Sequence, residues 1–243
     1  MTGDGVNDLL ALREADCSIA VADGSDASRQ ISQIVLLDSD FTNLPQVVME
    51  GRKVVNNVTR TAGVFFIKTI YSVLVSILCL VTNIPFPFIP IQITLIDACI
   101  EAYPSFISII ESDTRKIKGS FLKTALGNAL PFGLAVTAII LYISVKTLFE
   151  AAQCQTVMYL GLILVSMSAV IKSCYPFNKL RSFICVTMVA GTAFALAILP
   201  HLFKITAVTT GMRVYLLGIV FVSAVLIFYI IGLQKKIKIF YLV

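Results

Sequence analysis

Two carboxylates and a carboxamide stand close together at the start of the chain. Asp4 and Asp8 are four positions apart, Gly5 allows a tight backbone turn between them, and Asn7 precedes the second carboxylate. Carboxylate oxygens are the hard ligands that Mg²⁺ prefers. Helix-forming residues follow from 9 to 15, so the loop leads into a helix N-terminus, which favours phosphate. The pattern therefore predicts a site that holds Mg²⁺ against a phosphate.

A second pair of carboxylates lies inside an apolar segment. Asp97 and Glu101 are the only carboxylates near the middle of such a segment, and a spacing of four residues puts both on one helix face. Such charges are costly in a membrane, at roughly 2.5–3.5 kcal/mol each on insertion scales. Two carboxylates also repel unless a cation lies between them or one is protonated.

Pro104 adds a third oxygen to this pair. It has no N–H, so the carbonyl of Ile100 is left without its helical donor and is able to accept a cation. Two carboxylates and a carbonyl suit a hard cation such as Ca²⁺, Mn²⁺ or Mg²⁺. A hydrogen-bond network between helices is the alternative, and we favour the cation site because intramembrane carboxylates are functional by default.

Three polar residues in the preceding apolar segment lie within reach of this site in sequence terms. Thr69 and Ser72 are spaced i, i+3 and would either complete the ligand set or serve in helix packing. Lys68 would either extend to the membrane interface or pair with a carboxylate, and we favour the interface.

The elements that position the first site alternate between helix and strand over residues 1–44. The sequence predicts helices at 7–14 and 25–31, the second capped by Ser25, and strands at 17–21 and 34–37. No strand is predicted before the loop. This is half of a doubly wound α/β domain, too small to bury a core of its own, so we expect the chain to be the downstream end of a longer one.

A long helix and a series of membrane spans follow. Pro45 opens a helical pattern of nearly 40 residues that rises from the α/β region into an apolar stretch. Six segments have spanning length, and they cover 61–82, 88–110, 126–146, 155–173, 183–200 and 212–233.

Composition and charge agree with a membrane protein. The chain is 58% apolar, and nine of its fourteen acidic residues lie in residues 1–60. Lys and Arg are concentrated in the 110–125 loop, the 172–182 loop and the tail, with Lys118 and Lys238 among them, which predicts cytoplasmic N- and C-termini. The net charge of +5 therefore comes from membrane-flanking residues, so we expect no nucleic-acid partner. The six cysteines are scattered and predict neither disulfides nor a zinc site.

At this point the sequence resembles the P-type (E1–E2) cation-transporting ATPases. The run MTGDGVND at 1–8, with Ala11-Leu12 and Ala15-Asp16 after it, is similar to the hinge motif of that family's phosphorylation domain. Glu50-Gly51-Arg52 and Asn56-Asn57 ahead of a span add to the resemblance. It implies an α-helical membrane protein with six transmembrane helices, preceded by a partial α/β haloacid-dehalogenase-like phosphorylation domain. The implied divisions are 1–44 for that domain, 45–60 for a stalk helix and 61–243 for the membrane domain.

The resemblance also implies roles for single residues. Asp4 would ligate Mg²⁺, Asp8 and Asn7 would lie in its outer shell, and Thr2, Gly3 and Gly5 would form the phosphate loop. Aligned on Ile89-Pro90-Ile91-Gln92, the chain resembles the calcium pumps of this family. Asp97 and Glu101 then fall on a liganding Asn and Asp, and Thr69 and Ser72 on a liganding Asn and Glu. The hydroxyl of Ser72 thus replaces a carboxylate, which changes the expected stoichiometry.

The family's phosphorylated aspartate lies in the run Asp-Lys-Thr-Gly-Thr, which this chain lacks. We therefore expect the chain to act with a missing N-terminal part of the pump, which would bind ATP, and not to be catalytically competent alone. The expected function is ATP-driven transport of a hard cation, Ca²⁺ first, in a bacterial plasma membrane. The alternatives are a six-span remnant or regulator without ATPase activity, and a passive cation channel.

Overall fold

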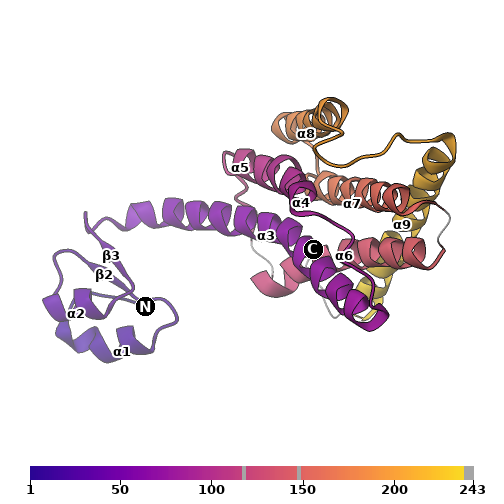
Figure 1. Ribbon diagram of the computed structural model, residues 1–243. Coiled ribbons are helices and arrows are strands. Elements are labelled where there is room, and N and C mark those ends of the chain that lie inside the picture. Colours follow the sequence, from indigo (N-terminus) through magenta and orange to yellow (C-terminus); the bar gives the residue numbers. More distant parts are fainter. Residues whose placement is uncertain (117–118, 147–148, 238–243) are drawn as a thin grey trace. The chain divides into compact units, whose positions relative to one another are not determined.

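The computed structural model describes residues 1–116, 119–146 and 149–237, and the chain divides into two compact units, Met1–Gly51 and Arg52–Val243 (Figure 1). The loop lysine Lys118 and the tail lysine Lys238, on which the predicted orientation partly rests, lie outside the described residues. One helix, α3 (Leu44–Thr82), begins in the first unit and continues into the second.

Unit 1 is a three-stranded parallel sheet with two short helices. The strands β1 (Thr2–Gly3), β2 (Ile19–Val21) and β3 (Ile34–Leu36) lie in the order β1-β2-β3. Between them run a 3₁₀ turn, η1 (Val6–Asp8), and helices α1 (Leu9–Glu14) and α2 (Asp26–Ile31). A further 3₁₀ turn, η2 (Phe41–Asn43), precedes α3. The small buried core of unit 1 consists of Leu12, Ala20 and Leu36.

The predicted alternation in this unit is confirmed, with one correction. Ser25 caps α2 as expected, its Oγ accepting the N–H of Ser28 at 3.1 Å. The expectation that no strand precedes the loop is wrong, because Thr2 and Gly3 pair with Ile19 and Ala20 of β2. Two residues are too short a run to show any hydrophobic period in the sequence.

Unit 2 is helical. Its long helices after α3 are α6 (Phe121–Lys146), α7 (Ala151–Ser173), α8 (Lys179–Ile198) and α9 (Thr210–Ile237). Among the described residues, these four and α3 are long and apolar enough to cross a membrane, which gives five candidate spans. Helices α6, α7 and α9 pack against one another around a common apolar core (Figure 1).

The predicted second span, residues 88–110, is broken into three helical pieces. They are α4 (Pro90–Leu95), a π-helical stretch η3 (Ile96–Ala102) and α5 (Tyr103–Ser108). The N–H of Tyr103 bonds to the carbonyl of Ala98, five residues back, which is the π register. Pro104 follows directly and cannot donate to an α-helical ladder, and this gives a physical reason for the change of register. No piece alone has spanning length.

The broken segment is fixed at both ends by polar contacts, which are buried at the first end and partly buried at the second. The Gln92 side chain is fully buried, and its Nε2 donates to the carbonyl of Phe203 at 2.9 Å. Tyr159 of α7 donates from its hydroxyl to the Gln92 carbonyl at 3.0 Å. At the other end, the hydroxyls of Tyr103 and Thr187 of α8 are 2.6 Å apart. Helices α7 and α8 therefore hold the segment in place.

Helix α3 crosses α6 at two glycines. Gly63 of α3 lies where a Cβ atom would be 3.6 Å from the carbonyl oxygen of Ala125, which is ordinary contact. Gly133 of α6 lies closer still, because a Cβ atom there would be 2.5 Å from Cγ2 of Ile70. Small residues at helix crossings let backbones approach closely in membranes. Gly133 therefore sets the distance between α3 and α6.

We expect Gly133→Val to loosen this crossing and to destabilise unit 2, because the new side chain meets Ile70 at both Cβ and Cγ2. Overpacking of this kind typically costs about 1–3 kcal/mol. Thermal unfolding of the detergent-purified protein measures the loss. Gly191→Val in α8 is the matched control, because no atom lies within 4 Å of its added Cβ. Equal melting temperatures for the two variants would contradict the assignment.

Candidate functional site

The first predicted site lies at the carboxyl end of β1, where ligands bind in parallel α/β sheets. Asp8 has a local role there, because its Oδ2 accepts the backbone N–H groups of Asp4 at 3.2 Å and Gly5 at 3.3 Å. Gly3 is the residue that needs to be glycine, since a Cβ atom there would be 2.6 Å from Cβ of Asp8. The carboxylate of Asp8 thus closes the loop on itself.

One expectation about this loop is wrong. Gly5 has φ −104° and ψ 169°, an extended conformation that any residue adopts, and a Cβ atom there would meet nothing closer than 3.9 Å. The close approach to Asp8 occurs at Gly3, two residues before Gly5. Thr2 is exposed at the edge strand β1, and Asn7 is exposed in η1.

The backbone of Asp4 is held by the start of α2. Its carbonyl accepts the N–H of Ser25 at 2.7 Å and the hydroxyl of Ser28 at 3.2 Å. The Asp4 side chain is exposed and accepts no hydrogen bond from the described residues. A fixed backbone with an unengaged carboxylate at the carboxyl edge of the sheet is a fitting ligand for Mg²⁺.

The second predicted site contains an ion pair between α3 and η3. Nζ of Lys68 lies 2.7 Å from Oδ1 and 2.6 Å from Oδ2 of Asp97. The preference for Lys68 at the membrane interface is therefore wrong, and the alternative of pairing with a carboxylate is the one observed. The physical reason is distance, because η3 brings the half-buried carboxylate of Asp97 beside Lys68 of α3, and a charge in apolar surroundings is stabilised by a partner.

Glu101, the other carboxylate, is 3% exposed and its Oε2 has no hydrogen-bond partner among the described residues. Tyr71 of α3 is 1% exposed, and its hydroxyl also has no hydrogen-bond partner in the described part of the chain. Tyr71, Asp97 and Glu101 are within electrostatic reach of one another. Buried polar atoms are normally paired, so two unpaired oxygens here call for an explanation.

The remaining predicted ligands are less closely engaged. Thr69 is exposed and Ser72 is half-buried, and neither donates a hydrogen bond to Asp97 or Glu101 in the described part of the chain. Ile100 is fully buried, within the π-helical stretch. The described residues contain no cluster of three or more His, Cys, Asp or Glu side chains able to hold a metal ion. A cation at this site would thus rely on two carboxylates and neutral oxygens.

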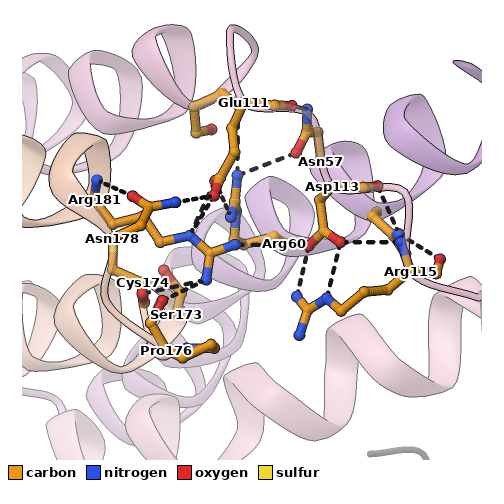
Figure 2. Close-up of polar contacts among 12 residues, drawn as sticks. Asn57, Arg60, Glu111, Asp113, Arg115, Ser173, Cys174, Pro176, Asn178 and Arg181 are labelled. Carbon is orange, nitrogen blue, oxygen red and sulfur yellow. Dashed lines mark hydrogen bonds and ion pairs between the residues drawn. The ribbon is translucent and has the colours of Figure 1, made fainter.

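A third polar cluster, the Glu111 network, joins α3 to the segment after α5 and to the start of α8 (Figure 2). Arg60 of α3 donates to Oε2 of Glu111 at 2.8 Å, and Arg181 of α8 donates to the same oxygen at 3.0 Å. Asn178, the N-cap of α8, donates to Oε1 at 2.7 Å. Asn57 donates to the Glu111 carbonyl at 3.0 Å. One carboxylate therefore ties three segments together.

Asp113 and Arg115 extend the network. Arg115 donates to both carboxylate oxygens of Asp113, at 2.8 and 2.6 Å. Asn56 donates to the carbonyls of Asp113 and Arg115, at 3.0 and 2.9 Å. The adjacent pair Asn56-Asn57 thus fixes the backbone of the segment that links α5 to α6.

The charged partners in the Glu111 network lower the pKa of both carboxyls. Burial alone would raise the pKa of Glu111, but the hydrogen bonds and charges of Arg181 and Arg60 outweigh it and hold that pKa below its ordinary value. Hydrogen bonds from Arg115 hold the pKa of Asp113 below its usual range. Both groups are therefore ionised when the unit is folded at neutral pH.

Sequence reasoning did not single out Tyr71, Arg60, Glu111 or Arg181. Tyr71 follows an apolar pattern on α3, and only the fold reveals that its hydroxyl has no hydrogen-bond partner among the described residues and is within electrostatic reach of Glu101. A weak signal existed for Glu111, which is one of just five acidic residues after position 60. It lies in a loop, however, and its partners are far away in sequence.

Five long apolar helices with a charged pair among them define an integral membrane protein. No family model matches the chain. The chain is 40% identical over 224 residues to the Probable cation-transporting ATPase exp7 of Streptococcus pneumoniae, covering 86% of this chain and 28% of that protein. It is 34% identical over 246 residues to the Calcium-transporting ATPase CtpE of Mycolicibacterium smegmatis, covering 93% of this chain and 31% of that protein. The corresponding protein of Mycobacterium bovis is 43% identical over 147 residues, which are 56% of this chain and 18% of that protein.

Over most of its length, the chain is similar in sequence to P-type cation-transporting ATPases, which are ATP-hydrolysing translocases. It spans less than a third of the length of these curated relatives. What it does as part of a pump is therefore taken up below.

The lowered pKa values predict a pH dependence of stability. The contribution of the Glu111 network is fully present above the unfolded pKa values, about 4.3 for Glu and 3.9 for Asp, and is lost as pH falls through the lower folded values. Glu111→Gln removes the charge that pairs with Arg60 and Arg181 and leaves Arg181 only its longer ion pair with Asp113, at 3.6 Å, so we expect it to cost about 3–5 kcal/mol at pH 7. We also expect it to flatten the acid limb of a curve of melting temperature against pH.

Glu150→Gln is the matched control for that measurement. Glu150 is exposed and its side chain does not cap α7. An unchanged melting temperature for Glu111→Gln at pH 7 would show that the network does not stabilise unit 2.

Proposed function

We propose that the chain supplies the cation-binding helices and part of the phosphorylation domain of a P-type pump. In this proposal the whole pump forms an aspartyl-phosphate from ATP and moves a hard cation, Ca²⁺ in the first instance, past Asp97 and Glu101. Calcium-transporting relatives support the choice of cation. They do not favour a non-enzymatic remnant, and nothing in the described residues favours a passive channel.

The observation that carries the proposal is the pair of unpaired oxygens. Glu101 Oε2 and the Tyr71 hydroxyl are both buried, and neither has a hydrogen-bond partner among the residues that the structure describes. A bare carboxylate oxygen in an apolar bundle is unfavourable unless it is protonated or bound to a cation. The carboxylate oxygen of Glu101 is a hard donor of the kind that Ca²⁺ takes. The unpaired oxygens therefore support a cation site centred on Glu101.

Lys68 sets the charge of this site. Its ammonium neutralises Asp97, so one carboxylate charge remains to be balanced. A cation that is to bind both carboxylates has to compete with Lys68 for Asp97. We infer that Lys68 holds Asp97 when no cation is bound and moves aside, or limits the site to Glu101, when a cation enters.

The broken segment suits this role. Helices interrupted at membrane depth are tolerated where they are covered by protein or line a cavity, and they free backbone groups for ions. We propose that residues 88–110 cross the membrane as a sixth, discontinuous span, with the carbonyl of Ile100 among the ligands. Six spans place both termini on one side, the cytoplasmic side of a bacterial plasma membrane by the charge of the loops.

The Asp4 loop would serve the phosphoryl step. Mg²⁺ held by Asp4 would neutralise phosphate oxygens during the reaction. The chain's own part is then to present the Asp4 carboxylate, whose backbone Ser25 and Ser28 fix, while Asp8 closes the loop. The region at residues 45–60 would act as the stalk, since it belongs to the single helix α3 that reaches Lys68.

The membrane site is tested by cation binding to the purified full chain in detergent. We expect Glu101→Gln to weaken binding of ⁴⁵Ca²⁺ or Mn²⁺ at least tenfold, because the unpaired carboxylate is removed. Lys68→Gln should instead strengthen binding, because Asp97 loses its competing ammonium. Glu150→Gln is the control for a carboxylate outside the site. If Glu101→Gln binds as the unaltered chain does, the site is wrongly assigned.

The Asp4 loop is tested by Mn²⁺ binding, followed by electron paramagnetic resonance as a readout of the Mg²⁺ site. Asp4→Ala should abolish binding in the presence of phosphate. Asp16→Ala is the matched control. Asp16 is an exposed carboxylate that precedes β2, so it lies toward the amino ends of the parallel strands, whereas Asp4 lies at the carboxyl end of β1. Equal Mn²⁺ affinity in both variants would rule out the role of Asp4. The membrane site would be unaffected by that outcome.

A further inference from the structure

A cavity of about 600 Å³ opens at one end of the helix bundle of unit 2. It lies where α6 begins, where α7 ends and beside the part of α3 that carries Asn56, Arg60 and Ile67. Its volume is within the range of ligand sites in proteins, about 300–1,000 Å³. Neither predicted functional site includes this cavity.

The rim of the cavity is strongly cationic. Five basic side chains line it, namely Arg60, Arg115, Lys116, Lys172 and Arg181. Two carboxylates lie against them, Asp113 in the lining and Glu111 beside it, paired with Arg60 and Arg181. Three positive charges are thus in excess, so the rim favours an anion. Asn56, Thr59 and Asn128 add neutral hydrogen-bonding groups.

The deeper wall of the cavity is apolar. It is formed by Val64 and Ile67 of α3, Phe132 of α6 and Ala169 of α7. From Asn56 at the rim to Ile67 in the apolar wall, the lining follows α3 for eleven residue steps, about 16 Å at 1.5 Å per residue. Nζ of Lys172 lies 5.2 Å from the centre of the Phe132 ring, where the cationic rim meets the apolar wall. The lining of the cavity therefore changes from polar and charged to apolar along α3.

We infer that this cavity binds an anionic phospholipid of the surrounding membrane. Its phosphate would lie among the basic side chains of the rim, and an acyl chain would run along Val64, Ile67 and Phe132. Basic pockets between membrane helices are sites for anionic lipid headgroups, and each Lys or Arg near the surface contributes about a fivefold gain in affinity. A free phosphate ion would use the rim alone and leave the apolar wall without an occupant.

The site has a bearing on the Glu111 network, since Arg60, Asp113, Arg115 and Arg181 belong to both. A lipid phosphate at the rim would add an acceptor beside arginines that already hold the segment after α5. Binding is therefore expected to stabilise unit 2. This makes thermal stability a usable readout in addition to direct detection of the lipid.

The test uses the full chain, purified and stripped of lipid in a neutral detergent. Phosphatidylglycerol, phosphatidylcholine with the same acyl chains, and inorganic phosphate are titrated separately, with melting temperature and native mass spectrometry as readouts. We expect phosphatidylglycerol to bind and to raise the melting temperature, with little effect of the other two. Lys172→Gln and Lys116→Gln should each weaken its binding about fivefold.

Lys179→Gln is the matched control, because Lys179 is exposed at the start of α8 and does not line the cavity. Both test positions are exposed, so the variants are expected to fold, and circular dichroism checks this. Equal binding of the two lipids, or equal loss of binding in Lys179→Gln and Lys172→Gln, would overturn the inference. So would full stabilisation by inorganic phosphate, which would make the cavity an anion site without lipid.

Discussion

Polar groups buried in an apolar helix bundle need hydrogen-bond partners, and this constraint acts most strongly around Pro104. Pro104 has no N–H, and the residues before it form a π-helical stretch, Ile96–Ala102. At its end, the N–H of Tyr103 donates to the carbonyl of Ala98, five residues back. Asp97 and Glu101 both lie in that stretch, so the same irregularity that breaks the helix also carries its two charges. The rest of unit 2 is arranged to hold the break. The broken segment is anchored to its neighbours by hydrogen bonds of Gln92, Tyr159 and Thr187. Lys68 pairs with the Asp97 carboxylate.

The two carboxylates illustrate how environment separates like groups. Asp97 has a cation of the protein's own within 2.7 Å, whereas Glu101 is more deeply buried and keeps one oxygen without a partner. An ion pair and a carboxylate oxygen without a hydrogen-bond partner among the described residues thus lie about one helical turn apart. The combination explains why an apolar bundle tolerates both groups, since only one of them requires an external partner to remain charged.

Sequence patterns predicted much of this architecture. They failed for contacts that depend on how closely two segments approach each other in the fold. Helix α3 and the alternation of unit 1 were predictable because their apolar periods and caps are local, as Ser25 shows. Asp97 and Glu101 were predictable because charges stand out in an apolar run. The pairing of Lys68 was not, because a lysine in that position extends either to the interface or across to a neighbour, and the choice depends on how closely η3 approaches α3. The π register and the Glu111 network were missed for the same reason. Pro104 indicated a free carbonyl but not a shift of the ladder, and Glu111 meets partners on α3 and α8 that no local pattern connects.

Helix α3 is joined to the 97–111 segment at two points, through Lys68 to Asp97 and through Arg60 to Glu111. These two anchor residues are eight positions apart, about 12 Å along the helix axis. A helix held by a single ion pair is still able to rotate about that contact, whereas two ion pairs at different heights oppose both sliding and rotation about the helix axis. Any displacement of α3 past this segment therefore has to release both ion pairs together or bend the helix between positions 60 and 68. Both attachments contribute to the barrier for such a motion, and the more buried of them, between Arg60 and Glu111, is the one that does not involve Asp97.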